Sequence, residues 1–213
     1  MGEGIALEKG IWVTGSGTAT GARDECVITV GSEVRRPSAA GALAASAASL
    51  EQMRGVLVGS GVPVTALTTS AVSLTPVYDT YPTVAGFQAA VQLTATTRDI
   101  EAAGALLSAV VEAGGDAARV HDVTFRHSDP SGLMVRAREA AWADALGRAS
   151  QLAGLAGREL GEVLAIDETV GRPRPPGPMR MAAMAESDAP GRMSLDAGEG
   201  SVVVSLTVGW SLR

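Results

Sequence analysis

Three residue types in this chain could form a chemical site: glycine, histidine and cysteine. The glycines near the start of the chain have the spacing of a phosphate-binding loop. Gly15, Gly17 and Gly21 have a spacing that imitates a dinucleotide-binding loop. That chemistry needs a strand, a tight turn and then a helix whose N-terminus holds the pyrophosphate. Here Arg23-Asp24 leads into another strand-like run instead. We therefore interpret the three glycines as part of a glycine-rich strand and turn.

The two histidines and the cysteine are also poorly placed for a site. His121 and His127 fall on one face of a strand-like run, but six residues of extended chain span about 20 Å, too far for both to ligate one ion. Cys26 lies on the apolar face of another strand, where a thiol is usually a small inert hydrophobe. A Ser-His-Asp arrangement lacks the Gly-x-Ser-x-Gly elbow. The sequence predicts no catalytic, cofactor-binding or metal-ligating residues, no cofactor and no enzyme activity.

A long segment rich in proline and methionine interrupts the second half of the chain. It runs from Gly171 to Gly200 and predicts a flexible loop, because no apolar periodicity anchors it. A methionine cluster could also bind a soft metal such as Cu(I), but no cysteine or histidine accompanies it. The four methionines of the segment are Met179, Met181, Met184 and Met193.

Composition excludes several classes of function. Only 3% of the 213 residues are aromatic and the net charge is −6, which disfavours nucleic acid as a partner. No apolar run approaches the roughly 18 residues of a membrane span, so we expect no membrane insertion. The start of the chain lacks the pattern of a secretory signal, which predicts a cytoplasmic protein; the alternative is a periplasmic or exported protein whose signal was removed.

The order of strand-like and helical runs predicts an α+β fold. A strand, a long helix and two more strands occur between Asp24 and Asp99, and the same order returns between Val120 and Arg213. We expect two β-α-β-β halves, each with an antiparallel sheet packed against its long helix. The predicted divisions are a tail at 1–10, a first half at 11–99, a linking helix at 100–115 and a second half at 116–213.

Six motifs in order along the chain resemble those of the SIMPL-domain family. The resemblance runs from about Ile11 to Arg213, nearly the whole chain. It rests on the segments Trp12–Gly17, Ser73–Asp79, Gly86–Ala89, Val123–Asp129, Arg138–Ala145 and Ala153–Gly157.

The resemblance implies an α+β protein that often self-associates and that is linked in bacteria to envelope and oxidative-stress physiology. It implies no catalytic residues. We therefore expect a non-enzymatic protein that acts as a homo-oligomer or by binding another protein, through its sheet edges or the small-residue helix near Ala137–Ala145. The alternative is a small-molecule-binding protein or an enzyme with a cleft between the two halves.

Overall fold

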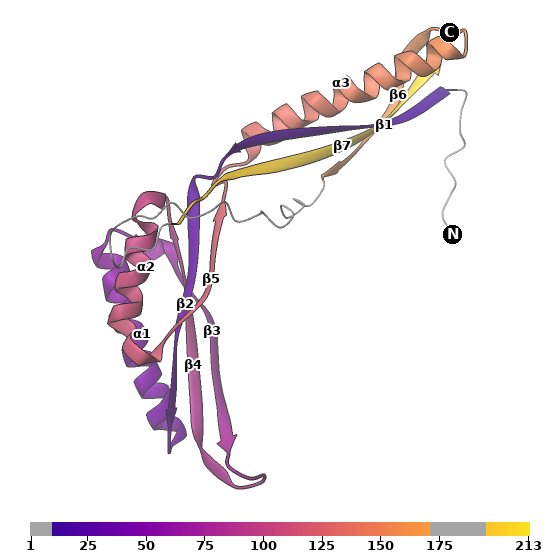
Figure 1. The fold of residues 1–213 in the computed structure, drawn as a ribbon. Coiled ribbons are helices and arrows are strands. Elements are labelled where there is room, and N and C mark those ends of the chain that lie inside the picture. The colour runs from indigo at the N-terminus through magenta and orange to yellow at the C-terminus, as the bar shows by residue number, and fades with distance from the viewer. Residues whose placement is uncertain (1–9, 171–194) are drawn as a thin grey trace, which may run out of the picture. The chain divides into compact units, whose positions relative to one another are not determined.

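The computed structural model describes residues 10–170 and 195–213, which form two compact units (Figure 1). Seven strands and three α-helices make up the described residues, with short 3-10 turns at Val64–Ala66 and Gly115–Ala117. The helices are α1 (Ala39–Gly59), α2 (Ile100–Gly114) and α3 (Ser131–Leu155). The strands are β1 (Gly10–Ala22), β2 (Glu25–Arg36), β3 (Leu67–Tyr78), β4 (Val84–Thr97), β5 (Ala118–Arg126), β6 (Leu160–Val170) and β7 (Glu199–Leu212).

The three-stranded unit is an antiparallel sheet of order β1-β7-β6 with α3 on one face. Alternate residues of β7 point into its core, where the side chains of Val204, Leu206, Val208 and Trp210 are buried. On the α3 side the core is a row of alanines four residues apart, each with an exposed fraction of 0%: Ala137, Ala141, Ala145 and Ala149.

Close packing of α3 on β1 depends on two glycines. Gly15 and Gly17 alternate with exposed polar residues, so both face the helix. A methyl group on Gly17 would overlap the Ala137 carbonyl and the Ala141 amide, and one on Gly15 would overlap the backbone of the next helical turn. Because both sides of the contact lack bulk, the helix backbone lies directly on the strand.

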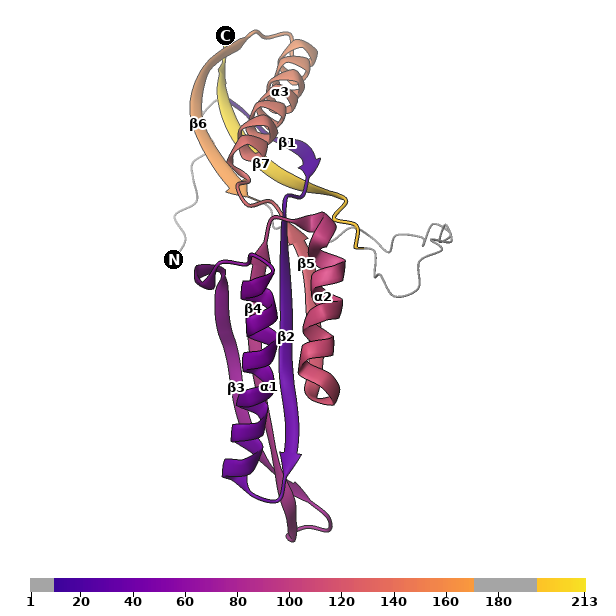
Figure 2. The ribbon, with the colours of Figure 1, turned by 90° about the vertical axis from the view of Figure 1, so that its left-hand side faces the viewer.

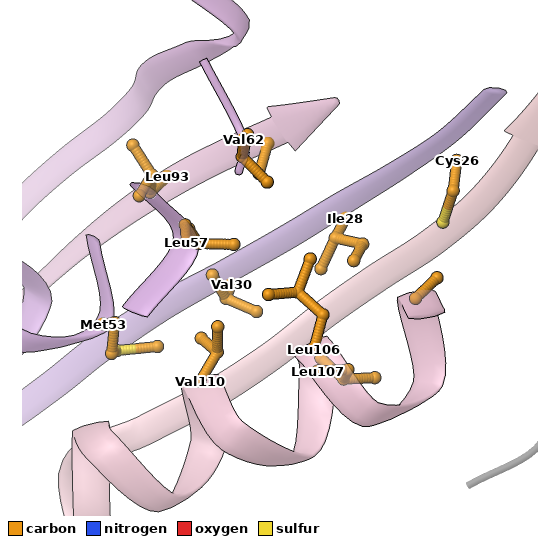
Figure 3. Close-up of a cluster of buried hydrophobic side chains, with 12 residues drawn as sticks. Cys26, Ile28, Val30, Met53, Leu57, Val62, Leu93, Leu106, Leu107 and Val110 are labelled. Carbon is orange, nitrogen blue, oxygen red and sulfur yellow. The ribbon is translucent and has the colours of Figure 1, made fainter. Parts of the chain in front are cut away.

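The four-stranded unit is an antiparallel sheet of order β3-β4-β2-β5, with α1 and α2 on the same face (Figure 2). Its core is formed by aliphatic side chains from both helices and from the central strands (Figure 3). Ile28 and Val30 of β2 meet Leu57 of α1 and Val110 of α2 there, all with exposed fractions of 0–1%. Cys26 of β2 lies in the same core, which confirms the predicted apolar face of that strand.

The N-termini of the helices follow the chain's capping residues. Ser38 accepts a hydrogen bond from Gly41 N at 3.2 Å, and Asp99 accepts one from Ala102 N at 2.9 Å. At the start of α3, which begins at Ser131, Pro130 lies at the cap position and Asp129 accepts a hydrogen bond from Ser131 N at 2.9 Å.

The α+β class with antiparallel sheets is confirmed, but the strands are shared between the repeats. The last strand, β7, pairs with β6 as expected and also with β1 from the start of the chain, while β5 of the second repeat pairs with β2. The reason is complementarity of faces. The glycine face of β1 fits the alanines of α3, and Val123 and Phe125 of β5 pack on the core beneath α1 and α2.

The predicted helix at 100–115 is α2, which is a core element of the four-stranded unit as well as the segment connecting the repeats. The predicted tail at 1–10 and loop at 171–200 lie outside the described residues, except at their ends. Gly10 belongs to β1, and Glu199 and Gly200 belong to β7. The methionine cluster of that loop also lies outside the described residues.

Candidate functional site

Two of the three glycines that imitate a dinucleotide fingerprint, Gly15 and Gly17, are packing residues. Gly15, Gly17 and Gly21 all lie in β1, which confirms the interpretation as a glycine-rich strand. The space above Gly15 and Gly17 is filled by the backbone of α3, so no phosphate group could approach there.

Cys26 and the two histidines are not brought together. The Cys26 thiol is buried in the core of the four-stranded unit, and burial raises its pKa above the ordinary value, so the nucleophilic thiolate is disfavoured. His121 lies at a bulge of β5 with Nε2 over Gly31, whereas His127 follows the end of that strand. In the part of the chain that the structure describes, no group of three or more His, Cys, Asp or Glu could hold a metal ion.

One serine and one aspartate do meet at the junction after β5. Ser128 donates to Asp24 twice, from its backbone N at 2.7 Å and from Oγ at 2.6 Å. The hydroxyl proton is therefore held by a carboxylate, and His127 Nε2 has no hydrogen-bond partner among the described residues. A nucleophilic serine needs its proton taken by a base, so this pair is a structural clamp that joins the ends of β2 and β5.

The clamp predicts a loss of stability in acid. The Ser128 hydroxyl, and after it the Ser128 backbone N–H, lowers the pKa of Asp24 below its ordinary value of 3.8. Because the folded-state pKa is the lower one, this stabilisation is present above about pH 3.8 and is lost as the pH falls through the folded-state pKa. We expect Asp24→Asn to lower the urea midpoint at pH 7 and to change it little at pH 2.

The Ser128→Ala variant serves as the matched control, since it removes the strongest donor and leaves the carboxyl group. Its pH dependence should be weaker than that of the wild-type chain. If Asp24→Asn lowered the urea midpoint equally at both pH values, the ionised carboxylate would not be the stabilising species.

A more informative feature of the described chain is its four sheet edges, because an open edge exposes unpaired backbone groups that can bind another strand. The edge of β1 is closed by its own helix. Side chains of α3 bond to its outward backbone groups: Ser16 N donates to Asp144 Oδ2 at 2.9 Å, and Arg148 and Arg136 donate to Thr14 O at 3.2 Å and Thr20 O at 3.1 Å.

The edges of β5 and β3 have other obstacles to strand addition. β5 has a bulge near His121 and carries charges, including Arg119, Asp122 and Arg126. β3 has register irregularities at two places and contains Pro76, which cannot donate a backbone hydrogen bond. Bulges, charges and proline are the devices by which natural edge strands avoid pairing.

The edge of β6 is open from Ala165 onward, although the strand has two register irregularities before that residue and also carries Asp167 and Glu168. Every residue from Glu162 to Val170 is exposed, and the strand keeps a regular register with β7 from Ala165 onward. Within the described chain, no side chain bonds to the backbone of residues 163–170. The exposed apolar side chains are Val163 (43%), Leu164 (47%), Ile166 (57%) and Val170 (50%).

The prediction that the small-residue surface of α3 near Ala137–Ala145 docks on a partner is wrong. Ala137, Ala141 and Ala145 have exposed fractions of 0% because β1 covers them. The sequence pattern correctly indicated close approach, but the partner is a glycine-rich strand of the same chain. The apolar residues of β6 were visible in the sequence, whereas its place at a sheet edge was not.

Three groups with shifted pKa values among the described residues lie in separate surroundings. Besides Asp24 and Cys26, the third is Asp144, whose pKa is lowered chiefly by the backbone N–H of Ser16 and then by the charge of Arg148. Each shift has a structural cause. They do not form the cluster of perturbed titratable groups that would favour an enzyme.

Comparison with known proteins identifies the family of the chain. The model of the SIMPL family, described as a protein of unknown function (DUF541), matches residues 11–210, and the chain belongs to that family. It is also similar to the 26 kDa periplasmic immunogenic proteins of Brucella melitensis and Brucella abortus. Each is 28% identical over 217 residues, covering 95% of this chain and 84% of the relative. The family resemblance seen in the sequence is thereby confirmed.

Proposed function

We propose that this chain is a non-enzymatic assembly module that pairs with a second copy of itself through β6. The supporting observation is the exposure of every residue from Glu162 to Val170 on an edge strand that its own unit leaves open. Partial burial of an exposed aliphatic side chain contributes on the order of 1 kcal/mol, and β6 offers several such side chains. Strand pairing adds backbone hydrogen bonds to this apolar contact.

A two-fold symmetric pairing is compatible with the order of residues in β6. Opposed residues of antiparallel strands share a face, and the regular stretch begins at Ala165. An axis at Glu168 places Ile166 opposite Val170 of the second copy. The two Glu168 carboxylates then face each other, each held by its own Arg138 at 2.9 Å. The axis at Asp167 would instead oppose two carboxylates that have no salt bridge among the described residues.

Light scattering at micromolar concentration tests this function. We expect the wild-type chain to form at least a dimer, with an interface above roughly 1,000 Å². Ile166→Lys should shift the mass to that of a monomer at the same concentration, because a charge would be desolvated at the centre of the contact. The fold should persist, since Ile166 is 57% exposed.

Val111→Lys is the matched control, because Val111 of α2 is also an exposed aliphatic residue, at 37%, and belongs to the four-stranded unit rather than to β6. It should keep the wild-type mass. A wild-type monomer at every concentration would remove the proposed function, and an unchanged mass for Ile166→Lys would move the contact away from β6.

The setting of this assembly is also a proposal. Both relatives are named as periplasmic proteins, which supports the exported alternative for this chain over a cytoplasmic location. No helix in the described ranges is both long and apolar enough to cross a membrane. Envelope or oxidative-stress physiology stays a prediction from the family resemblance.

A further inference from the structure

The tip of the β3–β4 hairpin, residues Tyr78 to Val84, carries an exposed aromatic pair. The sequence contains two tyrosines, and both lie in this tip. The Tyr81 side chain is 82% exposed and the Tyr78 side chain is 45% exposed, with ring centroids 5.4 Å apart. In a chain with 3% aromatic residues, two exposed rings in tilted contact at one turn are a concentrated apolar surface.

The tip lies at a free end of its unit. Figure 2 shows the β3–β4 turn extending past the end of β2 and the start of α1. Val84, which pairs with Tyr78 at the base of the turn, is also 45% exposed. The rings could therefore enter an apolar layer without the rest of the four-stranded unit entering it.

Backbone hydrogen bonds within the tip lower the cost of placing it in such a layer. Asp79 N donates to Thr83 O at 3.1 Å, and Thr83 N donates to Thr80 O at 2.8 Å. Burial of unpaired backbone groups in a lipid environment costs several kcal/mol per group. These internal hydrogen bonds reduce the number of groups that would need water.

Two arginines lie farther from the turn than the tyrosine rings. Arg35 and Arg36 end β2, opposite Gln88 and Phe87 of β4, and neither forms a salt bridge with a described residue. The Arg35 guanidinium lies near Gly86, at the base of the tip. Asp79 is the only acidic residue between Pro76 and Gln88. The order from the end inward is thus tyrosine rings and then uncompensated positive charge.

We propose that this hairpin tip docks on the surface of a lipid bilayer with anionic headgroups. Tyrosine prefers the boundary between acyl chains and headgroups, because its ring is apolar and its hydroxyl is polar. Arginine behind the ring reaches lipid phosphates, which accept its paired N–H groups. The contact is peripheral, and it uses a different unit from the β6 contact.

Vesicle sedimentation of the full chain tests the proposal. The probes are vesicles of phosphatidylcholine alone and of phosphatidylcholine with phosphatidylglycerol, at low salt. We expect binding to the anionic vesicles, reduced by roughly tenfold in Tyr78→Ser/Tyr81→Ser and in Arg35→Gln/Arg36→Gln. Val58→Ser/Val64→Ser is the matched control, because both valines are exposed, at 41% and 54%, near the end of α1 remote from the tip. It should bind like the wild-type chain.

Three results would overturn the proposal: no binding of the wild-type chain to anionic vesicles, equal binding by the tyrosine variant, or equal loss in the control. If the tyrosine variant changed the mass in solution without any vesicle binding, the tip would be a protein contact instead. Should the double variant unfold, Tyr81→Ser alone decides, because a side chain that is 82% exposed contributes little to the fold. Ile166→Lys should retain vesicle binding per chain, which separates this result from the assembly result.

Discussion

Gly17→Ala should destabilise the protein by about 3 kcal/mol or more, although it adds a single methyl group. The added carbon would overlap the Ala137 carbonyl and the Ala141 amide of α3. Both are helix backbone atoms, so no side chain can rotate away and the helix must move off the strand. Urea unfolding followed by far-UV circular dichroism measures the loss.

Two other glycines provide the control. Gly55 in α1 and Gly147 in α3 have nothing within 4 Å of an added methyl group. Alanine at either position should leave stability unchanged or raise it by about 0.5–1 kcal/mol, because glycine is a poor helix former. A small loss for Gly17→Ala, comparable to that of an exposed strand position, would contradict the close packing of α3 on β1.

Leu206→Asp should unfold the three-stranded unit at neutral pH. The Leu206 side chain is 6% exposed in the core beneath α3, and an unpaired charge there costs several kcal/mol out of the roughly 5–15 kcal/mol that stabilises a domain. Val91→Asp should do the same in the four-stranded unit, where Val91 is 7% exposed. A melt with no cooperative transition is the expected observation.

The neighbouring residues on the opposite faces are the controls. Thr207→Lys and Gln92→Glu should change the melting temperature by no more than a few degrees, because both side chains lie on the uncovered face of their sheet. Equal melting temperatures for the core and surface variants would mean that the faces of β4 and β7 are assigned wrongly.

Local patterns predicted most of the elements because they depend on near neighbours. The alternation of β7 and the caps at Ser38 and Asp99 each follow from a few residues. Strand partnership depends on surfaces brought together from distant parts of the chain. Gly15 and Gly17 indicate that something approaches closely, but nothing in their spacing says that α3, more than a hundred residues later, is what approaches.

Prediction of the candidate site was limited in the same way, because the site depends on which strands pair. Leu164, Ile166 and Val170 are visible as apolar residues of a strand, and a central strand would show them equally well. Only the sheet order makes β6 an edge. Likewise the three α3 side chains that close the edge of β1 are ordinary surface residues in a helical pattern until their hydrogen-bond partners are known.

Cross-linking between single-cysteine variants tests the β6 contact most directly. The natural Cys26 is fully buried and its pKa is raised, so a thiol-reactive linker should report only introduced cysteines. The symmetric pairing places Ile166 of one copy opposite Val170 of the other, about 5 Å apart at Cβ. Ile166→Cys and Val170→Cys should each give little cross-linked dimer alone with a short bismaleimide, and a strong dimer band when mixed. No dimer in the mixture, or no more than in the separate samples, would contradict assembly through β6.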